Sequence, residues 1–214
     1  MDRDQILLSV REIRAVAEWL NAPECPYVLQ KVPEDGVCLF RMLYDFTREC
    51  CRDGLVRLVE ARKQQTAGGG RKEKKKNNDD TDNLGSFCKI LAAGAVVSTE
   101  RLQKELGKRA VEQSSRKALK RLAASDDPVA LLQEGLWDEL EAQHVLRAFV
   151  EMMRDEGDVV VVVRLFQMSV TLDGRDVVRQ SEVHGDEEGA NGNVPTLVAF
   201  KWNGLPHFDV FRFV

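Results

Sequence analysis

Apolar side chains recur at helical spacing over most of the first 155 residues. The N-terminal stretch is amphipathic in this pattern, and one face carries Leu7, Val10, Ile13, Ala17 and Leu20. The same spacing predicts further helices over residues 39–62, 87–97, 99–124 and 136–153. Pro128 opens a helix or a turn between the last two, because proline is tolerated at a first helical position.

The pattern changes after Gly157. Residues 159–163 are five valines in a row, which predicts a buried strand that is too short to span a membrane. Asp173-Gly174 and Asn203-Gly204 each separate two runs of strand-forming residues, as the turns of β-hairpins do. Helices followed by a sheet indicate an α+β arrangement.

Two segments read as surface loops. Residues 64–83 combine three glycines with a basic block and an acidic block, and such a segment buries too little apolar surface to order itself. The alternative for Arg71–Lys76 is a nuclear-localisation or nucleic-acid patch. A solvated loop is favoured, because acidic residues soon follow and no aromatic residues interleave. Residues 184–193, rich in glycine and acids, predict a second flexible loop.

The composition limits the class of protein. The chain is 43% hydrophobic and 31% charged, with a formal net charge of -4, so it lacks the global basic surface of nucleic-acid binders. It has no apolar run long enough for a membrane span, and charges interrupt its N-terminal apolar stretch, unlike a signal peptide. We expect one domain, residues 1–214, in a reducing cell interior, cytoplasmic or nuclear. A secreted effector that acts inside a host cell fits the same pattern.

Five cysteines form an odd set with no CxxC pair, which argues against a disulfide framework or a structural zinc site. Four of them are expected to be small buried hydrophobic residues: Cys25, Cys50, Cys51 and Cys88. Cys38 is different, because it stands where the Asp35-Gly36 turn leads into a helix. A helix N-terminus stabilises a thiolate, and backbone N–H groups there can bind an oxyanion.

The last predicted hairpin supplies a partner for such a thiol. Alternation along a strand puts His207 and Asp209 on one face, so the carboxylate can accept a hydrogen bond from one imidazole nitrogen. The other nitrogen is then available as a base. A cysteine early in the chain and an oriented histidine near its end can form a nucleophile–base pair after folding.

Three motifs resemble those of one known family. DGVCLFRMLYDF, residues 35–46, is similar to the DGNCLFRAI-type signature of the ovarian tumour (OTU) family of cysteine proteases, most of which are deubiquitinases. LWDELEAQ, residues 136–143, resembles the Trp-Gly, Glu-Leu-rich helix between the catalytic segments of that family. His207-Phe208-Asp209 resembles its H-Y-D or H-Y-N motif. The motifs occur in the family's order, and this makes their combination specific.

The resemblance implies a Cys-His-Asp triad. Cys38 would be the nucleophile, His207 the general base and acid, and Asp209 the residue that orients the imidazole. The oxyanion loop would consist of Asp35, Gly36, Val37 and Cys38. The resemblance also implies a papain-like α+β fold, with an OTU-type mixed sheet packed between helices, and no metal or other cofactor. Val37 departs from the family's usual asparagine, and Phe208 from its tyrosine.

The expected function is thiol-dependent hydrolysis of (iso)peptide bonds after the C-terminus of ubiquitin or polyubiquitin, by a monomer without nucleic-acid or membrane partners. One alternative is a protease for another ubiquitin-like modifier. Another is a catalytically silent ubiquitin-binding module of the same fold, against which the presence of both Cys38 and His207 argues. A third is a nucleic-acid-associated scaffold that uses Arg71–Lys76. No feature of the sequence indicates the ubiquitin linkage or the natural substrate.

Other aromatic and histidine side chains have structural interpretations. Trp137 is expected to pack within a helix, and His144 lies on the apolar stripe of its helix as a core histidine. His184 is expected to be solvated in its loop. Trp202, next to the Asn203-Gly204 turn, is interpreted as a substrate-binding residue beside the cleft, with a role in bracing the hairpin as the alternative.

Overall fold

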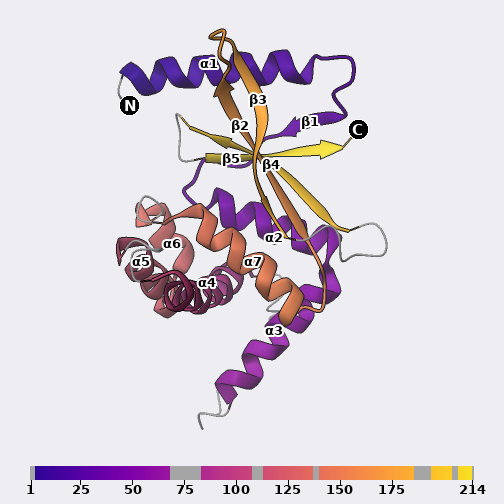
Figure 1. The fold of residues 1–214 in the computed structure, drawn as a ribbon. Helices are drawn as coiled ribbons and strands as arrows, with labels where there is room; N and C mark the ends of the chain where they lie inside the picture. The colour runs from indigo at the N-terminus through magenta and orange to yellow at the C-terminus, as the bar shows by residue number, and fades with distance from the viewer. Residues whose placement is uncertain are drawn as a thin grey trace.

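A five-stranded mixed sheet separates one long helix from the other helices (Figure 1). The computed structural model describes residues 3–67, 83–107, 113–136, 140–185, 194–203 and 207–213. Its helices are α1 (Arg3–Leu20), α2 (Cys38–Cys50), α3 (Arg52–Ala67), α4 (Leu84–Leu106), α5 (Gln113–Ala124), α6 (Pro128–Gln133) and α7 (Ala142–Asp155). Its strands are β1 (Tyr27–Gln30), β2 (Val162–Val170), β3 (Asp176–His184), β4 (Thr196–Trp202) and β5 (His207–Phe213). The α+β class predicted from the sequence is confirmed.

The strand order is β1-β5-β4-β2-β3, in which β2 and β4 are parallel and the other neighbours antiparallel. Both predicted hairpins are confirmed: β2 pairs with β3 around Gly174, and β4 pairs with β5, with Trp202 opposite His207. β1 was not predicted. It has four residues and pairs with β5, so pairing across the fold, more than local preference, defines it.

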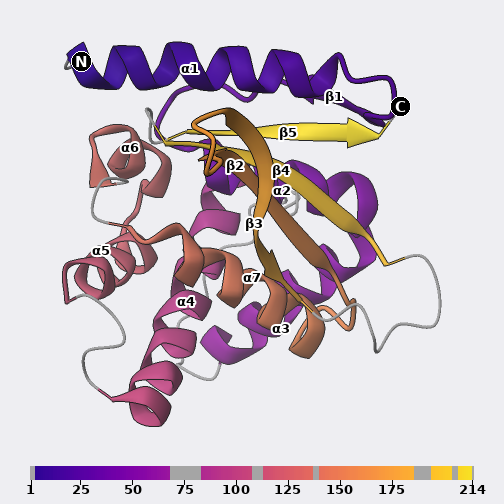
Figure 2. The same ribbon diagram turned by 45° about the horizontal axis from the view of Figure 1, so that its top comes forward.

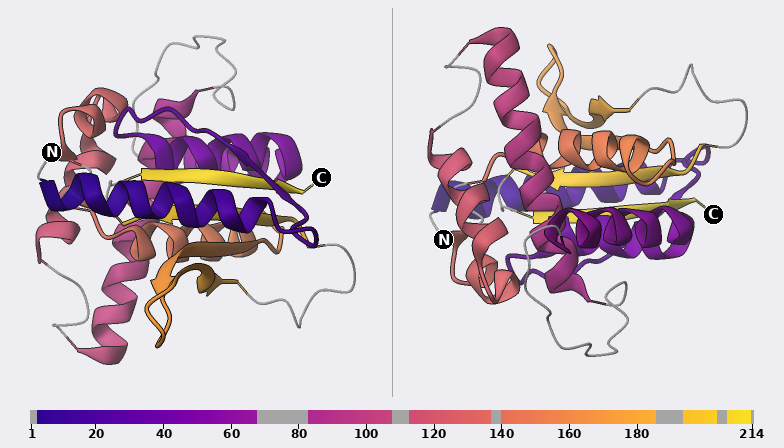
Figure 3. Two further views of the ribbon diagram at one scale, coloured as in Figure 1. Left: turned by 90° about the horizontal axis from the view of Figure 1, so that it is seen from above. Right: turned by 90° about the horizontal axis from the view of Figure 1, so that it is seen from below.

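Helix α1 covers one face of the sheet, and the other helices lie on the opposite face (Figure 2). The views from above and below show α1 crossing the sheet on its own, with α2 and α7 on the far side (Figure 3). The core on the far side joins apolar residues of α2 to α7 with Val163, Leu165, Leu197, Ala199, Phe208 and Val210 of the sheet. The smaller core under α1 includes Val16, Phe200, Trp202 and Phe211.

The face of α1 that packs is not the apolar face seen in the sequence. Ala15 and Val16 are buried against the sheet, and Trp19 stacks on Tyr27. Leu7, Val10 and Ile13 are instead 55%, 59% and 58% exposed. The helix itself is confirmed. Helical spacing alone did not show which face meets the sheet, because α1 has apolar side chains on a second, nearly opposite face.

Several predicted boundaries were wrong. The helix expected over residues 39–62 is broken at Cys51 into α2 and α3. The helices expected over 87–97 and 99–124 are divided elsewhere, because α4 runs unbroken through Ser98 and ends at Leu106. α7 begins at Ala142, so Leu136 precedes it. Residues 64–67 of the expected loop belong to α3, and the rest of it up to residue 82 lies outside the described residues. Among the described helices, none is long and apolar enough to cross a membrane.

Candidate active site

His207 and Asp209 occupy one face of β5, as alternation along the strand predicts. The imidazole Nε2 lies 3.0 Å from Oδ1 of Asp209, and both side chains are almost completely buried. Since Asp209 engages Nε2, Nδ1 is the ring nitrogen left for another partner. This atom is buried and has no hydrogen-bond partner among the described residues.

Cys38 is the second group that acts on the imidazole. It is the first residue of α2, a helix that packs beneath β5. Burial alone would lower the pKa of His207, and this is the largest single influence on it. Hydrogen bonds and charge interactions with Asp209 and Cys38 outweigh burial and raise this pKa to about 9. The structure thus brings the three predicted triad residues together from opposite ends of the chain.

Asp209 is completely buried, yet each of its carboxylate oxygens has two hydrogen-bond donors. Oδ1 accepts from the backbone N–H of Val32 at 2.8 Å and from His207. Oδ2 accepts from Nε1 of Trp202 at 3.0 Å and from Nζ of Lys31 at 3.2 Å. Burial raises the pKa of Asp209, but the His207 and Val32 hydrogen bonds and the nearby positive charges more than offset this and lower it. The carboxylate is therefore ionised and fixed in orientation.

The loop before Cys38 is held by one carboxylate. Asp35 accepts the backbone N–H of Val37 at 3.1 Å through Oδ1 and an Arg41 N–H through Oδ2. The N–H of Val37 is therefore already engaged. An oxyanion at this loop would therefore have to be bound by backbone N–H groups other than that of Val37. Val37, which stands where the OTU motif usually has asparagine, is completely buried in the apolar core.

Gly36 is required by the path of this loop. Its φ of +75° lies in the left-handed region, and a Cβ there would be only 2.9 Å from the carbonyl oxygen of Leu132 in α6. A side chain at this position would meet both backbone strain and a steric clash. α6 therefore supports the loop that carries the thiol.

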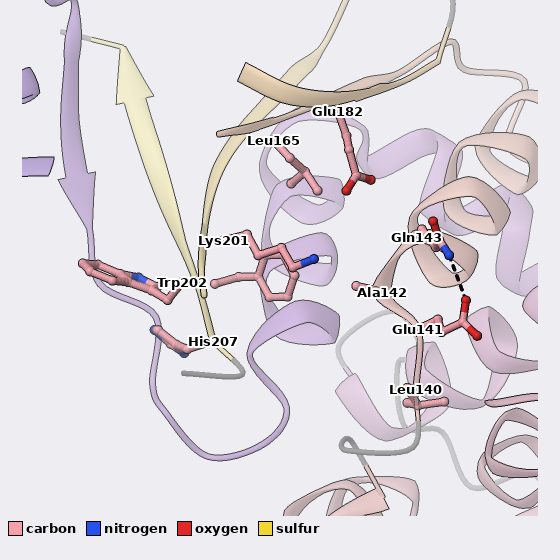
Figure 4. A pocket seen from close by; sticks show the side chains of 10 residues that line it. Leu140, Glu141, Ala142, Gln143, Leu165, Glu182, Lys201, Trp202 and His207 are labelled. Carbon is pink, nitrogen blue, oxygen red and sulfur yellow. Dashed lines mark hydrogen bonds between the residues drawn. The ribbon is translucent and has the colours of Figure 1, made fainter. Parts of the chain in front are cut away.

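A pocket of about 440 Å³ opens beside His207 (Figure 4). It lies between the segment that leads into α7 and strands β2 to β5, and its lining consists of Leu140, Glu141, Ala142, Gln143, Leu165, Glu182, Lys201, Trp202, His207 and Phe208. Glu182 and Lys201 extend toward the segment of residues 140–143 in Figure 4. Trp202 thus lines the pocket and also donates to Asp209. Cys38 is only 1% exposed and does not line it.

Sequence reasoning missed the residues that hold this site in place. Lys31 and Val32 follow the unpredicted strand β1 and bind Asp209. Glu12 of α1 is completely buried and accepts the backbone N–H of Asn203 at 2.6 Å, next to the turn before His207. No local signal marks these residues, because their partners lie more than 170 positions away. The pairing of Arg41 with Asp35 could have been predicted from the sequence, because the two residues are only 6 positions apart.

The other cysteines differ from one another. Burial raises the pKa of Cys51 to about 11 and that of Cys88 to about 12, which makes both thiols inert at neutral pH. Cys25 is half-buried and Cys50 is exposed, so the expectation of four buried cysteines was wrong for Cys50.

The two remaining histidines lie away from the triad. His144 is buried in α7, as expected of a core histidine, and its Nε2 lies 2.8 Å from Glu141 without making a hydrogen bond to a described residue. His184 was expected to be solvated in a loop. It ends β3 instead and lies 3.1 Å from Glu182, because the strand extends further than its sequence suggests.

Some predictions fall outside the described residues, namely those for Trp137 and Arg71–Lys76. Within the described ranges no group of three His, Cys, Asp or Glu side chains could hold a metal ion. Comparisons with profiles of known protein families, with curated proteins and with solved structures found no match.

Proposed function

We propose that this chain is an OTU-like thiol peptidase of papain-like architecture, which hydrolyses the (iso)peptide bond after the C-terminus of ubiquitin. The observation that carries the proposal is the buried array of Cys38, His207 and Asp209. A thiol at a helix N-terminus, an imidazole and a carboxylate in this order have the roles of nucleophile, base and orienting group. The motif resemblance supplies the substrate class.

The chemistry follows from the charge states. With a pKa of about 9, His207 is protonated at neutral pH, and in the proposed mechanism this imidazolium faces the thiolate form of Cys38 that attacks the substrate. The thiolate attacks the carbonyl carbon of the scissile bond, and loop N–H groups stabilise the oxyanion. His207 donates its proton to the departing lysine amine as the C–N bond breaks, which leaves a thioester on Cys38. Water, deprotonated by His207, then releases the ubiquitin carboxylate and regenerates the thiolate.

The pocket beside His207 supports a role in holding the substrate tail. Its apolar floor includes Leu165 and Phe208, while Glu182 and Lys201 provide charged groups of both signs. A Gly-Gly tail presents backbone without side chains, and we place it in this pocket beside the imidazole. Since Cys38 is 1% exposed, substrate binding must first expose its sulfur.

The same burial favours a second candidate, a ubiquitin-binding module of this fold that does not turn over substrate. The two candidates differ in one measurable property. An enzyme forms a covalent bond between Cys38 and an electrophile at the ubiquitin C-terminus, whereas a silent module binds ubiquitin without this bond.

The test is labelling of the full chain with a ubiquitin active-site probe that carries a C-terminal electrophile. The wild type should gain one ubiquitin, and Cys38→Ala should gain none. Cys50→Ala is the matched control and should label like the wild type, because Cys50 is exposed and lies at the opposite end of the helix that Cys38 begins. Binding without labelling would identify the silent module, and equal labelling of Cys38→Ala would refute the assigned nucleophile. Probes built on other modifiers test the alternative substrate class.

A further inference from the structure

Lys31 reaches the buried end of the candidate triad from the solvent. It follows the last residue of β1, and its side chain is 67% exposed, whereas that of Asp209 is completely buried. Nζ lies 3.2 Å from Oδ2 of Asp209 and 4.9 Å from the centre of the Trp202 ring. A cation–π contact and a charged hydrogen bond therefore act on the same ammonium group.

The two carboxylate oxygens of Asp209 accept hydrogen bonds from different groups. Oδ1 faces His207 and the Val32 N–H, and Oδ2 faces Trp202 and Lys31. The donors at Oδ2 oppose rotation of the carboxylate, which would otherwise exchange the oxygen that His207 meets. The Trp202 N–H is neutral, so among the described residues Lys31 is the charged donor at Oδ2.

We propose that Lys31 is a positioning residue for the candidate active site: its ammonium group, placed over Trp202, holds Asp209 ionised and oriented toward His207. For turnover this inference rests on the proposed function. For the reactivity of the Cys38 thiol it does not, because that reactivity can be measured without ubiquitin.

The charged groups around the carboxylate determine the direction of the effect. Asp209 meets His207 on its own strand, Lys31 from the segment after β1 and the neutral Trp202 from β4. Glu12, the buried acid of α1 nearest this end of the hairpin, is bonded to the Asn203 N–H. Lys31 lowers the pKa of Asp209, so without it the carboxyl takes up a proton at higher pH. A protonated Asp209 no longer stabilises the imidazolium that pairs with the Cys38 thiolate.

The test measures alkylation of Cys38 by iodoacetamide across the acid range, with the Cys38 peptide followed by mass spectrometry. In Lys31→Met the acid-side midpoint should move to higher pH, and the rate near that midpoint should fall roughly threefold to tenfold. Lys31→Arg should restore both, because it keeps the charge. Lys117→Met is the control with the same loss of charge at an exposed position of α5, and it should match the wild type.

A double-mutant cycle separates this role from direct contact with substrate. If Lys31 acts through Asp209, Lys31→Met should have no further effect in an Asp209→Asn background. With ubiquitin substrate, kcat should fall while KM stays unchanged. An equal effect of Lys31→Met in both backgrounds, or an unmoved midpoint, would overturn the proposal. Because alkylation requires no ubiquitin, a failed deubiquitinase assay with a shifted midpoint would reject the proposed function and leave the role of Lys31 intact.

Discussion

At the scale of single residues, environment decides what a thiol can do. Cys51 and Cys88 are buried among apolar groups, which raises the pKa of each thiol to about 11 and about 12. Cys38 is buried as deeply, yet it lies beside an imidazole that a carboxylate keeps protonated. Opposite charge nearby favours the thiolate, whereas burial alone favours the thiol. Cys38 is therefore the cysteine that we propose as the nucleophile.

The loop before Cys38 allows a residue-scale prediction with an internal control. Gly36→Ala should destabilise the protein more than Gly174→Ala, because both have positive φ but only Gly36 has a backbone atom in the way. Strain at Gly174 should cost about 1 kcal/mol, and the clash should add roughly 1–2 kcal/mol at Gly36. Urea denaturation of both variants measures this difference. Equal losses would mean that the Leu132 carbonyl does not restrict the loop.

At the scale of elements, α1 shows that a hydrophobic pattern can predict a helix without predicting which of its faces packs. Its exposed stripe includes Ile6, Val10 and Ile13, while its buried stripe includes Ala15, Val16 and the charged Glu12. A hydropathy pattern favours the first stripe, because glutamate weakens the second. Glu12 can nonetheless be buried against the sheet, because its carboxylate accepts a hydrogen bond from the backbone N–H of Asn203. The packed face of α1 thus depends on a hydrogen bond to a residue near the other end of the chain.

One substitution made at two positions of α1 tests this assignment. Val16→Ala should lower the free energy of unfolding by about 1–3 kcal/mol, because it leaves a cavity against the sheet. Val10→Ala should change it by no more than about 0.5 kcal/mol, because Val10 is 59% exposed and alanine favours a helix. Thermal or urea unfolding of the pair measures the contrast. A reversed order would show that the apolar face identified in the sequence is the one that packs.

At the scale of the whole molecule, the candidate site is a meeting point of both chain halves. The segment of residues 31–38 brings the Asp209 donors and the thiol, and the β4–β5 hairpin brings Trp202, His207 and Asp209. β1 connects the two parts, because it pairs with β5 and ends beside Asp209. Unfolding must separate all these groups together, so the charge state of the site is linked to global stability.

This linkage predicts how stability depends on pH. The pKa of His207 rises from 6.5 to about 9 on folding, so its protonated form stabilises the folded state. That contribution is complete below pH 6.5 and is lost as the pH rises through about 9. The loss should be on the order of 1–3 kcal/mol in the free energy of unfolding.

Chemical denaturation under reducing conditions across this pH window measures the effect. His207→Gln is the control, because it has no proton to lose there, and its stability should change less over the same window. Parallel pH dependence in the wild type and His207→Gln would show that the histidine is not held protonated by its partners.

The sequence by itself determined the local features. Asp-Gly and Asn-Gly turns specified both hairpins, alternation placed His207 and Asp209 on one face, and helical spacing located most helices. These depend on preferences of neighbouring residues, which a sequence displays directly. The tertiary structure alone decided the strand order, the existence of β1, the packed face of α1 and the roles of Lys31, Val32 and Glu12. Each of these is a contact between distant segments, whose free energy exists only after the chain has folded.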